Sequence, residues 1–196
     1  MIQVIIGESF CWAHLPKTGG TATLWMFKLF PEWAAGHAGH KHSTFADHEA
    51  EIEGKLLVSN FRRLPDWVLS WAHHRNAKAF KPDGTLPHMH SPWEMGEGQR
   101  ADHWLNLLLG EGRFEVGRWL RMESLAADFI EFLSPIREVD ETKRRQIEEI
   151  GQVNAIGYDH DLTHWFTPAH IRRMYERNPL WASVEEHVYG DLALLD

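Results

Sequence analysis

Cysteine is almost absent from this 196-residue sequence, which contains only Cys11. A single cysteine cannot form an intramolecular disulfide, so a disulfide-stapled scaffold is excluded and a reducing compartment is favoured. The thiol could act as a nucleophile, but a buried, inert cysteine is the commoner case.

Long hydrophobic runs are also missing. The longest, such as that over residues 104–109, fall far short of the roughly 18–20 residues that span a bilayer. Residues 1–7 have neither the basic nor the apolar region of a signal peptide. We therefore expect a cytoplasmic protein that has no membrane partner.

An excess of positive charge is absent as well, because 20 Lys and Arg residues face 28 Asp and Glu residues, giving a net charge of −8. This balance argues against nucleic acid as a partner. Residues 55–81 nevertheless carry a net charge of +5, and the remainder carries −13. The segment predicts a small anionic ligand, although a solvated helix face would explain it equally well. Its charged residues are Lys55, Arg62, Arg63, Asp66, Arg75, Lys78 and Lys81.

The composition, 43% hydrophobic and 24% charged, is that of an ordinary globular protein, and the length predicts a single domain over residues 1–196. Apolar runs and turn residues place strands and helices in alternation along the chain, with residues 33–42 ambiguous. This alternation predicts an α/β fold around a mainly parallel central sheet flanked by helices. Strands are expected at residues 10–15, 56–61 and 114–122, and helices at 20–30, 43–53, from Pro65, from Ser124, at 143–150 and at 168–177.

The most informative segment is HLPKTGGT, from His14 to Thr21, which follows a predicted strand and opens a predicted helix. Ligands of α/β sheets bind at such positions. Gly19 and Gly20 let the backbone approach an anion closely, and the helix N-terminus provides free N–H groups. Lys17 adds a full charge, and the threonines add hydroxyl groups. The magnesium-nucleotide loop G-x-x-x-x-G-K-[ST] has its lysine after the second glycine, whereas here Lys17 precedes both.

The segment resembles the 5′-phosphosulfate loop of the sulfotransferases, in particular the carbohydrate-type and small bacterial members. Residues 60–71, NFRRLPDWVLSW, are similar to that family's 3′-phosphate segment, with Arg62 and Ser70 at the family's spacing of eight residues. Residues 120–125, LRMESL, resemble its strand-end segment with a Glu before a helix. Residues 166–171, FTPAHI, resemble the final helix of small members.

The resemblance implies a P-loop-like three-layer fold and transfer of a sulfuryl group from 3′-phosphoadenosine 5′-phosphosulfate (PAPS) to a hydroxyl or amine. It also implies that Lys17 stabilises the departing phosphate, and that Thr18, Gly19, Gly20 and Thr21 hold the 5′ end. Arg62 and Ser70 would hold the 3′-phosphate, although Arg63 could exchange roles with Arg62. No metal is required in this scheme.

The acceptor, a small molecule or a saccharide, must lose a proton to a base. Histidine suits this role near neutral pH, and in some carbohydrate sulfotransferases a histidine lies between the first helix and the 3′-phosphate strand. His42 is therefore the first candidate, and the alternatives are His37, His40 and Glu49. The motifs His37-x-x-His40-x-His42 and His160-x-x-x-His164 could each place two imidazoles together on a metal, but neither has the Glu of a metalloprotease motif or a Cys partner.

Residues 81–99 are rich in Pro and Gly and carry bulky side chains such as Trp93. Long loops of this kind often bind ligands, so we expect an acceptor-side loop here, with Trp93 or Trp33 as an acceptor contact. Two other functions remain open. One is a P-loop nucleotide kinase-like transferase. The other is a non-catalytic nucleotide-binding relative, suggested by Pro65 and Trp67, which depart from the family pattern.

Overall fold

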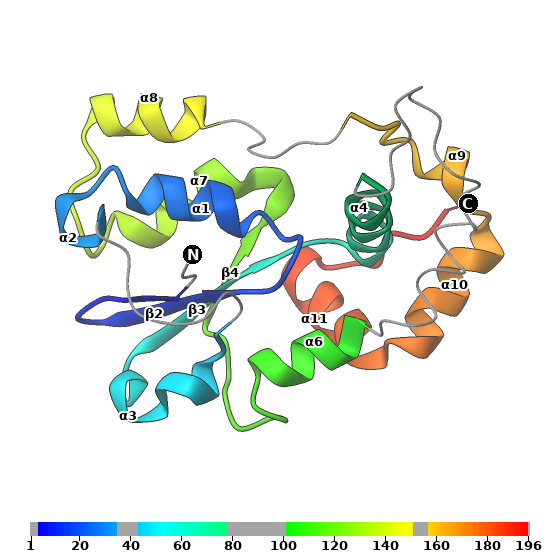
Figure 1. The fold of residues 1–196 in the computed structure, drawn as a ribbon, viewed down its shortest axis with the longest axis horizontal. Coiled ribbons are helices and arrows are strands. Elements are labelled where there is room, and N and C mark those ends of the chain that lie inside the picture. The colour runs from blue at the N-terminus through cyan, green and yellow to red at the C-terminus, as the bar shows by residue number, and fades with distance from the viewer. Residues whose placement is uncertain (1–3, 35–42, 78–100, 151–156, 196) are drawn as a thin grey trace. The chain divides into compact units, whose positions relative to one another are not determined.

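The computed structural model describes residues 4–34, 43–77, 101–150 and 157–195. The chain divides into two compact units, each built from two stretches of sequence (Figure 1). Met1–Phe61 and Asn106–Asn154 form what we term the sheet unit, and Arg62–Leu105 and Ala155–Asp196 form the helical unit. His37, His40, His42 and the loop at residues 81–99 lie outside the described residues.

The sheet has four strands in the order β1-β2-β3-β4. β1 pairs antiparallel with β2, whereas β2 with β3 and β3 with β4 are parallel. The expected α/β class with a mainly parallel sheet is therefore confirmed, and β1 is a strand that the sequence did not predict. The strands are β1 (Val4–Ile6), β2 (Phe10–His14), β3 (Leu56–Phe61) and β4 (Arg118–Arg121).

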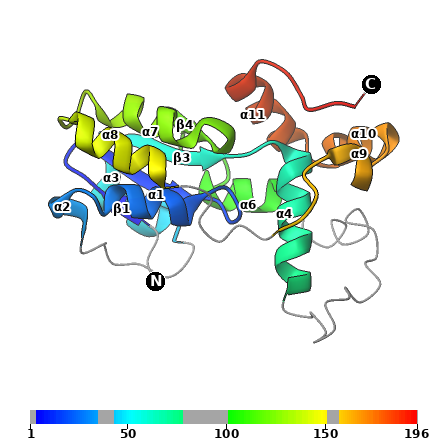
Figure 2. The same cartoon turned by 90° about the horizontal axis from the view of Figure 1, so that it is seen from above.

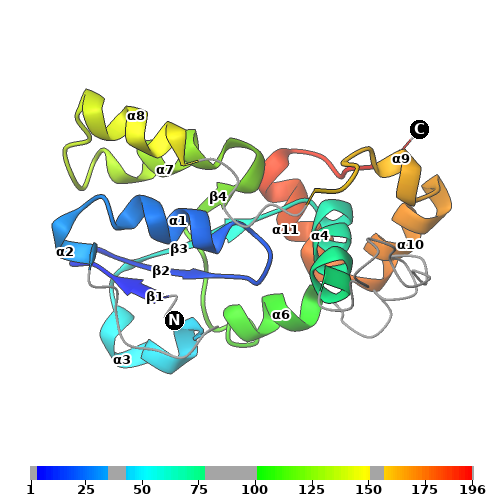
Figure 3. The same cartoon turned by 45° about the horizontal axis from the view of Figure 1, so that its top comes forward.

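Helices cover both faces of this sheet, which explains why every residue of β2 and all but the first of β3 are buried. On one face lie α1 (Gly20–Phe27), α7 (Leu125–Leu133) and α8 (Glu141–Glu149). On the other lies α3 (Glu49–Ile52), preceded by a 3₁₀ turn at Phe45–His48 (Figures 1 and 3).

Aromatic side chains fill the space between β2 and the helices above it. Phe27 of α1 lies edge-to-face with Phe129 at a centroid distance of 4.9 Å and with Trp33 at 5.5 Å. Trp33 also meets Phe10 at 5.4 Å and is 7% exposed. It is thus part of the core, which corrects its assignment to the acceptor site. It lies in α2 (Pro31–Ala34), a short helix that the sequence did not predict.

The fourth strand is shorter than the predicted 114–122. Gly110, Glu111 and Gly112 all have positive φ angles, of 55°, 59° and 89°, so the chain turns there before it can extend. Phe114 then packs against Phe45, with ring centroids 6.2 Å apart. Hydrophobic alternation over 114–117 therefore reflects loop packing rather than a strand.

The helical unit is organised around α4 (Leu64–Ala77), against which α10 (Pro168–Arg177) and α11 (Pro179–Tyr189) both pack (Figure 2). α9 (Leu162–Trp165) precedes α10, and α6 (Ala101–Leu108) begins in this unit. The predicted helix at 168–177 is confirmed, and its N-cap is Thr167, whose hydroxyl accepts from the His170 N–H. α6, α9 and α11 were not predicted.

A buried carboxylate joins the end of the chain to the start of α4. Glu185 is fully buried and accepts hydrogen bonds from the Tyr175 hydroxyl at 2.7 Å, the Leu64 N–H at 2.8 Å and Arg63 Nη1 at 3.3 Å. Burial raises the pKa of Glu185, against the effect of these hydrogen bonds. The segment that contains Arg62 is thereby fixed from α11, because Trp181 Nε1 also donates to the Arg62 carbonyl at 3.2 Å.

Candidate functional site

The predicted anion loop follows β2 and ends at the first residue of α1. Lys17 has a φ angle of 66° and Gly19 one of 87°, so both adopt the left-handed conformation. Gly19 is the N-cap of α1 and offers the helix no side-chain hydrogen bond. The loop therefore turns sharply twice and presents backbone N–H groups at the start of a helix, the arrangement of an anion-binding nest.

Packing explains why two glycines stand in this turn. A Cβ at Gly20 would overlap the ring of His14, which is buried and stacks on Trp12. A Cβ at Gly19 would come within 2.5 Å of Met122 Sδ. The structure thus brings the first and third sequence motifs together, because Met122 belongs to LRMESL.

A chain of buried hydrogen bonds ties the loop to the sheet. Trp12 Nε1 donates to Asn60 Oδ1 at 2.7 Å, and Asn60 Nδ2 donates to Thr23 Oγ1 at 2.7 Å. The Thr23 hydroxyl in turn donates to the Gly19 carbonyl at 3.3 Å. Strands β2 and β3 therefore hold α1 and its N-terminal loop in one position. Sequence analysis missed this role, although an Asn in an apolar strand was a visible signal.

The groups that the loop can offer to a ligand differ from residue to residue. Thr18 is fully buried, and its hydroxyl donates to the Leu15 carbonyl at 2.8 Å. Thr18 can therefore offer a ligand its backbone N–H rather than its hydroxyl. Lys17 and Thr21 are partly exposed. No acidic residue lies in the first turn of α1, so the lysine and the positive end of the helix dipole act together on an anion.

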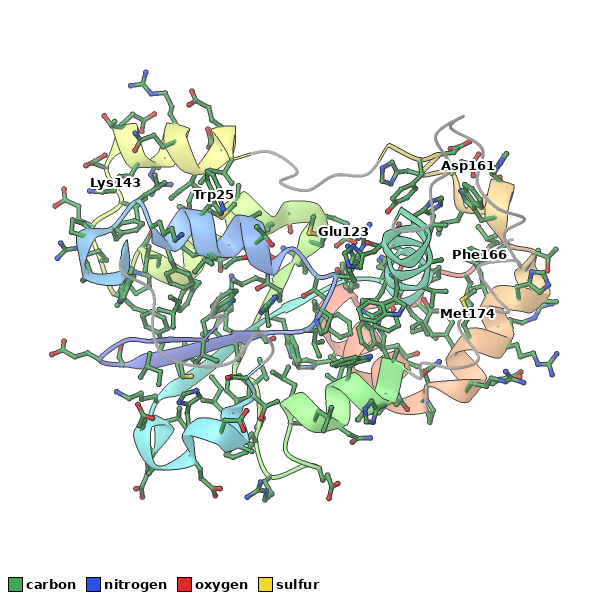
Figure 4. The ribbon with its side chains drawn as sticks, viewed as in Figure 1. Trp25, Glu123, Lys143, Asp161, Phe166 and Met174 are labelled. Atoms are coloured by element: carbon green, nitrogen blue, oxygen red, sulfur yellow. The ribbon has the colours of Figure 1, made fainter. Side chains whose placement is uncertain are left out.

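The third motif, LRMESL at residues 120–125, contains the ion-pair partner of a buried carboxylate and an exposed acidic residue. Arg121, the last residue of β4, binds the buried Asp128 of α7 through two side-chain hydrogen bonds, of 2.7 and 2.9 Å. Burial opposes ionisation of Asp128, but the hydrogen bonds from Arg121 outweigh it and lower its pKa. Glu123 lies exposed between β4 and α7 (Figure 4).

The helical unit contains the two residues expected to bind the 3′-phosphate. Arg62 directly precedes α4, and Ser70, 8% exposed, lies within that helix. Nη2 of Arg62 is 3.5 Å from the hydroxyl of Tyr158. Lys17 and the glycines belong to the sheet unit.

Two other basic residues of the segment at 55–81 make ion pairs or hydrogen bonds within the fold. Arg63 pairs with Glu185 at 3.3 Å and with Asp191 at 2.6 Å, and its guanidinium lies 4.3 Å from the centre of the Tyr189 ring. Lys55 donates to the carbonyls of Gly7 and Glu8. Arg63 and Lys55 therefore each have a role within the fold of their own unit.

His73 is a buried histidine that sequence analysis did not select. It lies one helical turn after Ser70 on α4 and is 5% exposed. Its ring is parallel to that of Tyr158 at 4.3 Å and edge-to-face with Trp165 at 4.9 Å. Burial, with a smaller contribution from His160, lowers its pKa, so His73 is neutral near pH 7.

Two other candidates are accounted for by the fold. Glu49, an alternative base, is exposed and pairs with Arg113 at 2.9 Å. Cys11 is fully buried, and burial raises the pKa of its thiol to about 12, with a further increase from Glu51. A thiol with that pKa is a poor nucleophile. Cys11 is therefore the buried, inert cysteine that the sequence led us to expect.

Within the described ranges, no three His, Cys, Asp or Glu side chains are grouped to hold a metal ion. The pair His160–His164 therefore has no third ligand in that part of the chain, and His37 and His40 lie outside it. Among the helices that the structure describes, none combines the length and apolarity needed to cross a membrane.

Comparisons with protein-family models, curated proteins and solved structures find no match to this chain. The likeness to sulfotransferases thus depends on the sequence motifs alone.

Proposed function

We propose that the protein is a PAPS-dependent sulfotransferase of P-loop-like fold, transferring a sulfuryl group to a hydroxyl or amine of a small molecule or saccharide. The observation that carries the proposal is the backbone of Lys17, held at a φ angle of 66° between β2 and α1. A lysine in the left-handed region costs about 1–2 kcal/mol. The packing of His14 and Met122 accounts for the two glycines, and the same turn holds the lysine just before the start of α1.

Within this scheme the loop residues act on the leaving group. The acceptor oxygen or nitrogen forms a bond to sulfur as the bond from sulfur to the bridging 5′-phosphate oxygen breaks. The bridging oxygen keeps the electron pair and leaves as part of adenosine 3′,5′-bisphosphate (PAP). Lys17 and the N–H groups of Gly19, Gly20 and Thr21 offset that growing charge. Transfers of this kind pass through a loose transition state in which positioning and charge stabilisation dominate.

Two further roles complete the proposal. Arg62 and Ser70 bind the 3′-phosphate, for which a guanidinium is well suited because it donates several hydrogen bonds in a fixed plane. His42 accepts the proton of the acceptor, as its place in the sequence suggests.

Thermal unfolding with PAP, ADP and ATP–magnesium tests the proposal. A ligand at about 100 times its dissociation constant adds roughly 2.7 kcal/mol to the free energy of unfolding. For a chain of this size the midpoint should rise by about 5–11 °C. We expect that rise with PAP, and sulfuryl transfer in a subsequent acceptor screen. A rise with ATP–magnesium alone would indicate a kinase. A rise with PAP but no transfer to any acceptor would indicate a non-catalytic relative.

A further inference from the structure

Tyr158 connects the expected phosphate ligand Arg62 to the buried His73. Its hydroxyl is 3.5 Å from Arg62 Nη2, and its ring lies flat on the imidazole of His73, with an interplanar angle of 0°. The same ring contacts that of His160 at 4.4 Å. All four residues belong to the helical unit. The faces of the tyrosine ring are thus engaged in packing, and the hydroxyl points to the guanidinium.

The distance between that hydroxyl and Arg62 is at the long, weak end of the hydrogen-bond range. Both groups can donate, and a phosphate oxygen accepts several donors at once. An oxygen placed between them would be bound by both at shorter distances than the two groups now have to each other. Ser70, one turn before His73 on the same helix, adds a third donor on that side of α4.

The imidazole that stacks on the Tyr158 ring is buried, and one of its nitrogen atoms is unpartnered in the described part of the chain. His73 is only 5% exposed, and its Nε2 has no hydrogen-bond partner among the residues that the structure describes. A buried polar atom without a partner costs about 1–3 kcal/mol. Stacking on Tyr158 and the edge of Trp165 fixes the histidine ring, and through it the tyrosine.

We propose that Tyr158 is a third ligand of the 3′-phosphate, donating its hydroxyl to the oxygen that Arg62 also binds, with His73 as the positioning residue that holds the tyrosine ring. This inference rests on the proposed function, because it assigns a residue to the same nucleotide. The ligand group is a phosphate monoester on the ribose, distinct from the 5′ group at the Lys17 loop.

The test measures dissociation constants for PAP and for AMP, which lacks only the 3′-phosphate, by calorimetry. Tyr158→Phe keeps the ring on His73 and removes the hydroxyl. We expect this variant to weaken the binding of PAP about tenfold and to leave the binding of AMP unchanged. Tyr189→Phe is the matched control, since it makes the same change in the same unit beside Arg63. It should leave the PAP-to-AMP ratio, that is, the affinity for PAP divided by the affinity for AMP, as in the wild type.

His73→Ala tests the positioning role. We expect it to lower the PAP-to-AMP ratio in the wild-type background and to have no further effect on that ratio in Tyr158→Phe, because both variants act through one hydroxyl. If the wild type prefers PAP to AMP and Tyr158→Phe keeps that preference, the assignment of Tyr158 is wrong while the proposed function stands. If the wild type binds both nucleotides equally, the proposed function fails, and this inference fails with it.

Discussion

Asn60 of β3 and Thr23 of α1 are joined by a buried hydrogen bond of 2.7 Å from the amide Nδ2 to the hydroxyl Oγ1. Because Asn60 also accepts from Trp12 and Thr23 also donates to Gly19, this one contact links two strands to the loop that carries Lys17. A parallel sheet leaves its loops at the carboxyl ends of the strands, and here side chains fix the loop to that edge.

Removing this link should destabilise the protein. Asn60→Ala leaves the buried Trp12 N–H without an acceptor, and we expect the free energy of unfolding to fall by about 1–3 kcal/mol. Thr23→Val, which keeps the shape of the side chain, should cost about 1 kcal/mol. Urea unfolding of both variants and of the double variant provides the measurement. The two effects should be less than additive, since each variant removes the same bond; strict additivity would show that the bond contributes nothing.

Much of the sheet unit could be predicted from the sequence, because buried parallel strands leave unmistakable apolar runs. Residues 56–61 were predicted as a strand and match β3 throughout. Residues 114–122 were predicted too long, because Phe114 packs on Phe45 from a loop and β4 begins only at Arg118. Local alternation does not distinguish such a loop from a strand. The loop motif predicted Lys17 and the glycines as candidates.

Other parts of the candidate site depend on contacts between distant segments. Tyr158 meets Arg62 across 96 residues, and Asn60 meets Thr23 across 37. Such pairs depend on how the helices pack, which a single sequence does not encode in any local pattern. α11 was missed for a related reason. Pro179 follows the predicted helix at 168–177 and begins a new helix, because proline also suits the first helical position. Asp102 caps that helix by accepting from the Trp181 N–H at 2.8 Å.

The close packing around Gly20 predicts that one added methyl group lowers the stability of the protein. Gly20→Ala would overlap the His14 ring, and overpacking of this kind costs about 1–3 kcal/mol. Gly157→Ala is the control, because nothing lies within 4 Å of its added Cβ and its φ angle is not positive. Thermal unfolding should show a lower midpoint for Gly20→Ala and no decrease for Gly157→Ala. An unchanged midpoint in Gly20→Ala would mean that His14 does not lie against the turn.

The left-handed conformation of Lys17 separates its role in stability from its role in catalysis. Lys17→Gly relieves the backbone strain, so it should be about 1 kcal/mol more stable than Lys17→Ala, which keeps that strain. Both variants lose the ammonium group, and both should lose nearly all sulfuryl transfer. Denaturant unfolding and a transfer assay on the two proteins give the comparison. Full activity in Lys17→Ala would exclude the proposed mechanism.

The ion pair between Asp128 and Arg121 predicts a pH-dependent contribution to stability. Asp128→Asn should lower the free energy of unfolding by about 1–3 kcal/mol at pH 7, because it removes charge-assisted hydrogen bonds to a buried carboxylate. The folded state lowers the pKa of Asp128, so its contribution is complete above the unfolded pKa of about 3.9 and is lost as the pH falls through the folded pKa.

The difference between Asp128→Asn and the wild type should therefore shrink below about pH 4 in urea unfolding at a series of pH values. Glu131→Gln is the control on the same helix. Its pair with Arg118 is exposed, and such pairs contribute about 0–1 kcal/mol. A difference for Asp128→Asn that stays constant down to pH 2 would contradict the assignment.

Adjacent arginines give the sharpest test of the 3′-phosphate site, because Arg62 and Arg63 differ in what they contact. Arg62→Ala should weaken the binding of PAP about 10- to 100-fold and should change the binding of AMP little. Arg63→Ala leaves the buried Glu185 without its cation, so it should cost about 2–4 kcal/mol of stability and leave the PAP-to-AMP ratio unchanged in the folded protein. Calorimetric titration with both nucleotides, together with unfolding curves, distinguishes the two residues. A selective loss of PAP in Arg63→Ala rather than Arg62→Ala would show that the two arginines exchange roles, and equal losses of both nucleotides in Arg62→Ala would remove Arg62 from the site.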